Sequence, residues 1–195
     1  MLLLATLTGA ALSPALLLCF VPVSPTWGSS ASPVINSVIS PKQESANPGL
    51  PARIKIPKIK VDAAIEVVGL TKDGAIGVPK GPTNTAWFNL GPRPGEIGGA
   101  VIIGHYGVWK GGLPTVFNNL YKLRKGDKIY IKDKKGATVT FVVRKLQTYG
   151  ENEAAPDVFN SNDEKAHLNL ITCQGIWNKN RKSYSERLVV FADKE

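Results

Sequence analysis

From Pro51 onward the chain is built of short runs of alternating apolar and polar residues, separated by turns rich in Gly and Pro. The alternation is clearest in Thr138–Val143, and it recurs in Arg53–Ile56 and Lys128–Lys132. A period of two residues is typical of β-strands that bury one face. Further strands are expected at Ala64–Leu70, Ala100–His105, His167–Cys173 and Arg187–Ala192. Many short strands joined by such turns indicate an all-β barrel or sandwich.

Four segments depart from this pattern. Thr85–Leu90 and Thr115–Leu123 have apolar residues at the spacing of short helices. In Glu151–Lys165, which is acidic and polar, we expect a long connection with one helical turn. Gly175–Glu186 is predicted to be a second long polar loop. Long loops on a compact barrel are where a binding groove is commonly built.

Residues 1–23 form an apolar segment that contains no charge between Leu2 and Val23. As a helix these residues would span about 33 Å, roughly one bilayer core. Two interpretations fit: an uncleaved membrane anchor, which we favour, or a signal peptide cut among the small residues of Gly28–Ser32. In both cases we expect the rest of the chain outside the cell membrane, either anchored to it or secreted.

Residues 24–50 have a different composition. Of these 27 residues, 13 are Ser, Pro or Gly, and only Lys42 and Glu44 are charged. Such a composition is typical of a flexible linker. We therefore expect residues 51–195 to form a separate domain.

The net charge of +9 lies in residues 51–195, because the apolar segment is uncharged and the two charges of the linker cancel. A basic balance suits nucleic acid, anionic lipid or anionic wall polymers. Export argues against nucleic acid as a partner. The basic run from Lys122 to Lys135 is interrupted by Asp127 and Asp133, which indicates a solvated surface.

Cys173 is the only cysteine of the domain, since the other one, Cys19, lies in the apolar segment. Exported proteins usually pair or avoid cysteines, because an oxidising compartment attacks free thiols. A single thiol at the end of the predicted strand His167–Cys173 is therefore interpreted as one kept for its reactivity.

Two histidines are available to act on this thiol. Alternation along the strand places His167 and Cys173 on the same outer face, with Leu168 and Leu170 facing the core. Six residues at about 3.3 Å each nevertheless separate His167 from the thiol by about 20 Å, beyond hydrogen-bond reach. His167 is predicted to be a surface or loop-packing histidine.

His105 is the remaining candidate, and it ends the apolar run Ala100–Gly104 with Gly107 close behind. If that strand lies beside the cysteine strand, the imidazole can hold the Cys173 thiol as a thiolate, the form that attacks a carbonyl. A purely structural histidine is the alternative interpretation.

Arg187 opens the last predicted strand. Hairpin pairing would bring it beside Cys173, where its guanidinium suits an oxyanion or a substrate carbonyl. A solvent-facing arginine at a strand end is the alternative.

Together these residues resemble the sortase family of cysteine transpeptidases. The resemblance rests on Leu170-Ile171-Thr172-Cys173, on Gly104-His105 and on Arg187 in Ser185-Glu186-Arg187-Leu188. Order and spacing agree as well, with Cys173 68 residues after His105 and Arg187 14 residues later. The resemblance covers Pro51–Glu195, and residues 1–50 are similar to the anchor and stalk of the family.

The resemblance implies a closed eight-stranded β-barrel with short helices between strands. It also implies a thiol transpeptidase, in which Cys173 attacks a threonyl carbonyl in an LPxTG-like sorting signal of a surface protein or pilin. An amine of lipid II, of another wall precursor or of a pilin lysine then resolves the acyl-enzyme. His105 would protonate the leaving amine, and Arg187 would hold the oxyanion or the substrate.

Sortases need no cofactor for this chemistry, and none is expected here. Some members bind calcium through acidic residues, but the corresponding segment Gly91–Gly98 offers only Glu96. Despite Glu151 and Glu153 in the later loop, no metal is predicted.

Three other protein classes are alternatives to a sortase. L,D-transpeptidases keep a histidine only a few residues before the cysteine within a Ser-His-Gly run, which is missing around His167. Papain-like and wall-peptidase folds place the histidine after the cysteine, and no histidine follows Cys173. A non-catalytic exported barrel that binds anionic wall polymers remains the alternative, and it predicts that Cys173→Ala leaves function intact.

Overall fold

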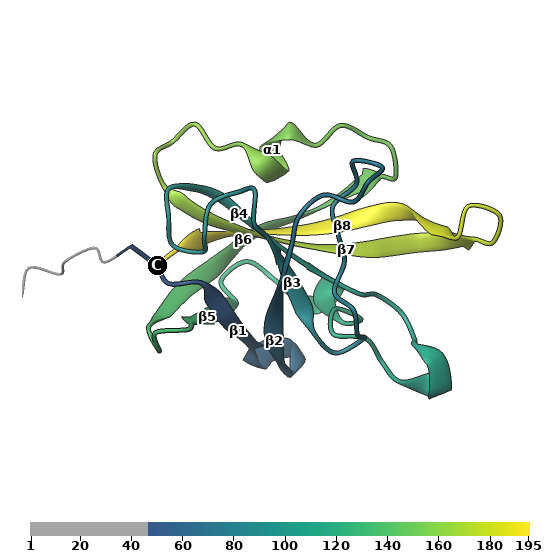
Figure 1. The fold of residues 1–195 in the computed structure, drawn as a ribbon, viewed down its shortest axis with the longest axis horizontal. Helices are drawn as coiled ribbons and strands as arrows, with labels where there is room; N and C mark the ends of the chain where they lie inside the picture. Colours follow the sequence, from purple (N-terminus) through teal and green to yellow (C-terminus); the bar gives the residue numbers. More distant parts are fainter. Residues whose placement is uncertain (1–46) are drawn as a thin grey trace, which may run out of the picture. The chain divides into compact units, whose positions relative to one another are not determined.

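Eight strands pair edge to edge around a full circle in the computed structural model, which describes residues 47–195 (Figure 1). Their order around the barrel is β1-β2-β3-β4-β7-β8-β6-β5. The strands are β1 (Pro51–Ile56), β2 (Val61–Val68), β3 (Thr85–Phe88), β4 (Gly98–Gly104), β5 (Lys128–Asp133), β6 (Thr138–Gly150), β7 (Ala166–Asn178) and β8 (Ser183–Lys194). The predicted closed eight-stranded all-β barrel is therefore confirmed.

Short helical turns connect some of the strands: η1 (Pro57–Ile59), η2 (Lys110–Gly112), η3 (Leu120–Lys122) and α1 (Pro156–Phe159). No helix within residues 47–195 is long and apolar enough to cross a membrane. The prediction for residues 1–23, and that for all but the last four residues of the linker, lies outside the described residues.

The barrel interior is filled by the apolar faces of alternating strands. In β1, Ile54 and Ile56 are fully buried, whereas Arg53 and Lys55 are exposed. Each such apolar side chain contributes roughly 1.5–3 kcal/mol through burial. All eight strands contribute to this core, so the barrel closes around one apolar interior.

The segment after β4 closes one end of this core. Phe117, Leu120 and Leu123 are fully buried, and their spacing of three residues matches the three-residue period of the 3₁₀-helix η3. The prediction of a helix over Thr115–Leu123 is thus confirmed only for this short turn.

The prediction of a helix over Thr85–Leu90 is wrong, because β3 occupies this segment. β3 pairs in parallel with β2 and antiparallel with β4, so neighbouring strands satisfy its backbone on both sides. Trp87 contributes its ring to the core and donates a hydrogen bond to the carbonyl of Pro92 (3.0 Å). Tertiary pairing overrides the local spacing here.

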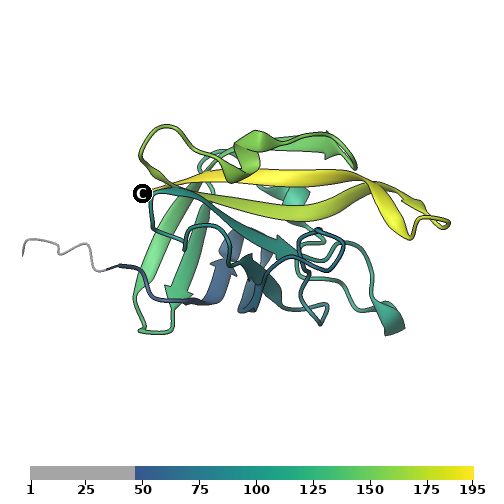
Figure 2. The ribbon, with the colours of Figure 1, turned by 45° about the horizontal axis from the view of Figure 1, so that its top comes forward.

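The connection between β6 and β7 lies across the outside of the barrel and carries α1, which confirms the predicted helical turn (Figure 2). Val158 of α1 is buried, and Asn169 of β7 donates a hydrogen bond to its carbonyl (2.6 Å). A second apolar cluster lies beneath the connection, formed by Val101, Ile103, Tyr149, Val158, Val189 and Phe191. One outer face of the barrel is therefore covered.

β7 and β8 form a long hairpin that projects beyond the barrel (Figure 1). Register pairs Trp177 with Tyr184, and only Lys179–Lys182 forms the turn. The prediction of a long loop over Gly175–Glu186 is therefore wrong. Cys173 also lies within a strand and not at its end, just before a bulge that Gly175 permits with its positive φ of 84°.

Candidate active site

Strand register brings the predicted site residues together at one edge of the barrel. Cys173 of β7 stands directly opposite Arg187 of β8 in an antiparallel pair. β7 also pairs in parallel with β4, and the Thr172 hydroxyl donates to the carbonyl of Gly104 (2.8 Å). His105 follows Gly104, just as Cys173 follows Thr172, so imidazole and thiol reach the same edge.

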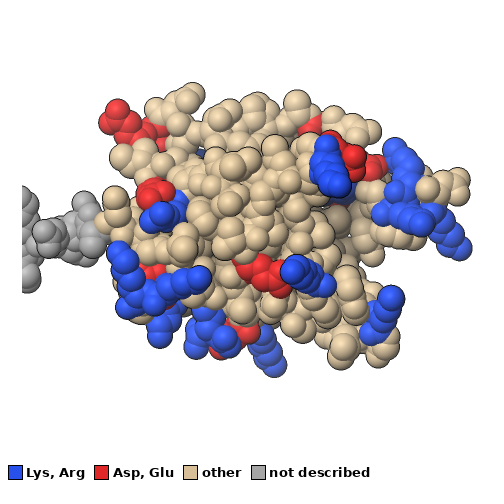
Figure 3. All heavy atoms as spheres, in the orientation of Figure 1, with Lys and Arg blue, Asp and Glu red and all other residues tan. Residues whose placement is uncertain are grey.

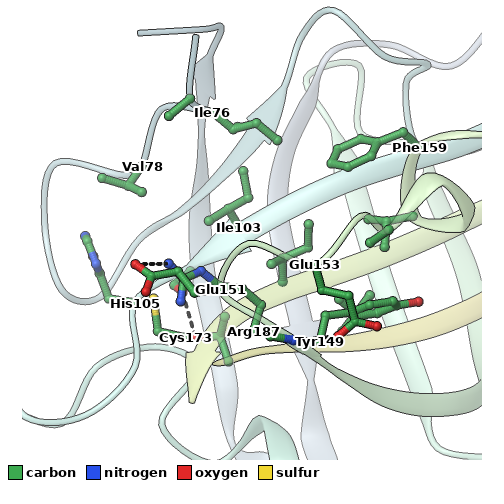
Figure 4. A pocket seen from close by; sticks show the side chains of 18 residues that line it. Ile76, Val78, Ile103, His105, Tyr149, Glu151, Glu153, Phe159, Cys173 and Arg187 are labelled. Atoms are coloured by element: carbon green, nitrogen blue, oxygen red, sulfur yellow. Dashed lines mark hydrogen bonds and ion pairs between the residues drawn. The ribbon is translucent and has the colours of Figure 1, made fainter. Parts of the chain in front are cut away.

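One cavity of about 420 Å³ contains all three side chains (Figure 4). Its polar end is lined by His105, Cys173, Arg187 and Glu151. Its apolar remainder is lined mainly by Ile76, Val78, Ile103, Val158, Phe159 and Ile171. The β2–β3 connection, the β6–β7 connection and the barrel strands therefore form a groove with a thiol at one end.

Burial is the main influence on the Cys173 thiol, and it raises the pKa of that group. The positive charge of Arg187 opposes this shift, whereas the carboxylate of Glu151 adds to it. The thiol is therefore favoured in its protonated form. The expected thiolate held by His105 is not the favoured state of this arrangement, and within residues 47–195 no hydrogen bond joins the two side chains.

The His105 imidazole is held by a hydrogen bond to the backbone of Pro79 and by packing against Trp109. Its Nε2 lies 2.8 Å from the carbonyl oxygen of Pro79. Because a carbonyl can only accept, this bond requires a proton on Nε2 and leaves Nδ1 as the basic nitrogen of the neutral ring. The Trp109 ring packs on the imidazole, with centroids 5.0 Å apart.

The glycines that flank His105 serve packing. A Cβ on Gly104 would overlap the ring of Phe117, which closes the barrel end. Gly107 has a φ of 87°, and the hydroxyl of Tyr184 approaches it closely. Both residues let other side chains come near the backbone around His105.

The guanidinium of Arg187 is tied to the hairpin. Nη1 donates to the carbonyls of Tyr184 (2.8 Å) and Glu186 (2.9 Å), and Nη2 donates to the Ser183 hydroxyl (3.1 Å). Glu151 lies 3.9 Å from Nη2 of Arg187 and 3.0 Å from Nη2 of Arg181. The positive charge of Arg187 therefore lies beside the Cys173 thiol, while the N–H groups of its guanidinium point along β8.

His167 lies away from this cavity and packs beneath the β6–β7 connection, in agreement with the sequence prediction. It is buried, with Nδ1 2.8 Å from Asp193 and Nε2 2.8 Å from Asp163. The bond with His167 is the largest influence that lowers the pKa of Asp163. His167 therefore joins the connection to β7 and β8.

The acidic residues considered for calcium have other partners. Glu96 accepts from the backbone of Arg93 (2.7 Å), and Glu153 accepts from the backbone of Gly150 (2.8 Å). Within the described residues, no cluster of three His, Cys, Asp or Glu side chains is arranged to hold a metal ion. The absence of a metal remains a prediction.

Several residues of the site were missed by the sequence analysis. Glu151 was considered only as a calcium ligand, and neither Pro79 nor Ile76 was connected with the site. These residues lie in connections far from Cys173 along the chain, and no spacing links them to it. Trp177 and Tyr184 pack on each other, with centroids 5.0 Å apart, and neither lines the cavity.

The sequence and the fold are similar to those of known sortases. A family model described as a sortase domain matches residues 54–195. Sortase C-1 from Actinomyces oris is 23% identical, with a TM-score of 0.58 over 74% of this chain and 73% of that chain. A lid mutant of sortase A from Corynebacterium diphtheriae is 24% identical, with a TM-score of 0.58 over 77% and 72%.

A sortase D5 transpeptidase of Clostridium perfringens is 27% identical, with a TM-score of 0.54 over 74% of this chain and 78% of that chain. No curated protein matches this chain. The two structures below 25% identity establish the shared barrel, and the family model covers most of the sequence, including His105, Cys173 and Arg187. This chain therefore belongs to the sortase family.

Proposed function

We propose that this sortase cleaves an LPxTG-like signal in a surface protein or pilin through an acyl-enzyme on Cys173. The protein is then transferred to an amine of lipid II, of another wall precursor or of a pilin lysine. The observation that carries the proposal is that Cys173, His105 and Arg187 share one cavity. The catalytic domain works outside the cell membrane, held there by residues 1–23.

The first half of the reaction makes a thioester. The Cys173 sulfur attacks the threonyl carbonyl, and its proton passes to His105. When the tetrahedral intermediate collapses, the imidazolium returns this proton to the departing amine, and the C-terminal peptide leaves. Because burial raises the pKa of Cys173, the proton leaves the thiol only as the substrate binds and attack begins.

Arg187 stabilises the negative charge that develops on the carbonyl oxygen. In the free enzyme its donors bond to Tyr184 and Ser183. Bound substrate supplies the carbonyl oxygen as a further acceptor beside Cys173, and one arm of the guanidinium fork turns to it.

The second half of the reaction reverses these roles. The acceptor amine attacks the thioester carbonyl, and neutral His105 takes the proton that the amine loses. The sulfur of Cys173 leaves as the carbonyl re-forms and takes this proton from the His105 imidazolium, so that the enzyme returns to its starting form. The apolar lining that includes Ile76, Val78 and Phe159 suits the apolar residues at the start of an LPxTG-like signal.

The test is a transpeptidation assay with the purified full chain, a fluorogenic LPxTG-like peptide and an oligoglycine amine. We expect cleavage, together with a ligated product identified by mass spectrometry. A library of related signals covers differences in specificity. Absence of turnover with every peptide, from a protein with an intact fold, would instead favour the non-catalytic wall-binding barrel.

A further inference from the structure

The far end of the β7–β8 hairpin and the neighbouring loop after β4 form one exposed surface, here called the tip surface. Tyr184 joins the two parts, with its ring centroid 5.4 Å from that of Tyr106 and 5.0 Å from that of Trp177. The tip surface comprises Val108, Trp109, Lys110, Leu113, Ile176, Trp177, Lys179, Arg181 and Lys182.

Large apolar side chains stand open to solvent on this surface. Ile176 is 80% exposed, Val108 70% and Leu113 55%. Trp109 and Trp177 lie partly exposed among them. A soluble domain rarely gathers so many apolar groups on projecting loops unless they contact another phase or partner.

The charges of the tip surface have one sign. No Asp or Glu occurs in residues 105–114 or 174–185, whereas the same two segments contain four Lys and Arg residues. Figure 3 shows Lys and Arg gathered at the right-hand end of the molecule, where the hairpin projects. Of these four cations, only Arg181 has an acidic partner among residues 47–195, in Glu151, so Lys110, Lys179 and Lys182 are free to meet an anion.

We infer that the tip surface is a docking site for an anionic lipid membrane. Tryptophan and aliphatic side chains interleaved with lysines are typical of protein surfaces that insert among lipid headgroups. The lysines complement negative headgroups, and the apolar side chains enter the boundary of the acyl chains. A soluble phosphodiester polymer would engage the lysines but would give no reason for exposing Ile176 and Val108.

This contact is additional to any anchor at residues 1–23. The described chain begins at the opposite end of the barrel from the hairpin turn (Figure 1). A linker of 27 residues spans at most about 90 Å, so an anchored domain can still lay its tip on the membrane. Trp109 packs on His105, so the docked surface adjoins the candidate active site.

Vesicle binding of residues 47–195 tests the inference. This fragment contains the whole closed barrel and its core, and it excludes residues 1–23 from the measurement. We expect sedimentation with phosphatidylcholine vesicles that contain about one third phosphatidylglycerol, and little with pure phosphatidylcholine. Lys179→Gln and Lys182→Gln should each weaken vesicle binding about fivefold, because each removes one positive charge.

Matched variants at the other end of the domain serve as controls. Lys134→Gln with Lys135→Gln removes the same charge, and Ile97→Ser removes an isoleucine that is 69% exposed. Ile176→Ser should weaken binding about tenfold, whereas the controls should stay near wild type. Quenching of tryptophan fluorescence by brominated lipid should fall in Trp177→Phe.

Two outcomes would overturn the inference. If the control variants weaken vesicle binding as much as the tip variants, general charge attraction accounts for it. If Ile176→Ser binds vesicles like wild type while the tip lysines remain necessary, the surface binds polyanions and not a membrane. All variants must unfold at the wild-type temperature, which the exposure of these side chains predicts.

Discussion

Cys173 and Arg187 face each other across the β7–β8 pair, yet the donors of Arg187 bond to Tyr184, Ser183 and Glu186 of the hairpin. Register places the charge beside the thiol, while the hairpin sets the direction of the guanidinium fork. Opposite positions in an antiparallel pair lie about 5 Å apart, so a small rotation of the arginine brings it to a group bound at the sulfur.

Arg187→Ala should lower kcat/KM for signal-peptide cleavage about 100- to 1000-fold, the effect of removing one oxyanion donor group. Arg187→Lys should recover only part of this loss, because an ammonium lacks the guanidinium fork. Steady-state kinetics on the three proteins measure the effect. Full recovery in the Lys variant would reduce the role of Arg187 to its charge alone.

Glu151→Gln should shift the pH profile of thiol alkylation to lower pH. The carboxylate of Glu151 raises the pKa of Cys173, so its neutralisation lowers that pKa and increases the thiolate fraction at any given pH. Arg187→Ala should shift the profile to higher pH, because Arg187 lowers the same pKa.

Iodoacetamide alkylation rates across a pH series provide the measurement. Glu153→Gln is the control, since Glu153 lines the same cavity without contributing to the shift at Cys173. An unchanged profile in Glu151→Gln would contradict the electrostatic role that we assign to this carboxylate.

His105→Ala should lower the catalytic rate, whereas His167→Ala should lower the thermal stability. Loss of the general acid at His105 should reduce kcat about 100- to 10,000-fold with little change in thermal stability. His167→Ala should keep near wild-type kcat, but its unfolding temperature should fall by several degrees, because Asp163 and Asp193 lose their shared partner. Assays below the unfolding temperature, together with calorimetry, distinguish the two. A catalytic defect in folded His167→Ala would contradict the assignment.

Gly104→Ala should destabilise the domain. The added methyl group would overlap the Phe117 ring, which is fully buried in the core. Overpacking of this kind costs about 1–3 kcal/mol. Denaturant unfolding of the variant should show this loss, and Gly81→Ala, where a Cβ would meet nothing, is the control. Equal stability of both variants would show that the barrel end repacks freely.

The barrel strands could be predicted because the core makes apolar and polar residues alternate along them. The same alternation helped to locate the site residues. In β7, Leu168 and Leu170 face the core, so the parity of the strand placed Cys173 outside correctly. On that same outer face, the length of strand between His167 and Cys173, at about 3.3 Å per residue, separated the histidine from the thiol and left His105 as the candidate partner. The expectation that hairpin pairing brings Arg187 beside Cys173 is confirmed by the register of β7 and β8.

The sequence did not predict the segments in which no strand face packs against the barrel core, because there the apolar residues do not alternate. Beyond Gly175 the hairpin leaves the barrel, so no core face imposes alternation on its strands, and Asn178, Ser183 and Ser185 make the segment resemble a polar loop in sequence. β3 is short and paired on both edges, and its sequence does not reveal these partners. The contact of Glu151 with Arg187 joins a connection to a strand, and only the folded chain brings them together.

The most direct test of the account is detection of the acyl-enzyme. Wild-type protein incubated with an LPxTG-like peptide, without an amine acceptor, should gain the mass of the N-terminal peptide fragment. Peptide mapping should locate this fragment on Cys173, and hydroxylamine should remove it. Cys173→Ala should gain no mass and cleave no peptide. Cleavage by folded Cys173→Ala, or an adduct on any other residue, would contradict the assignment of Cys173 as the nucleophile.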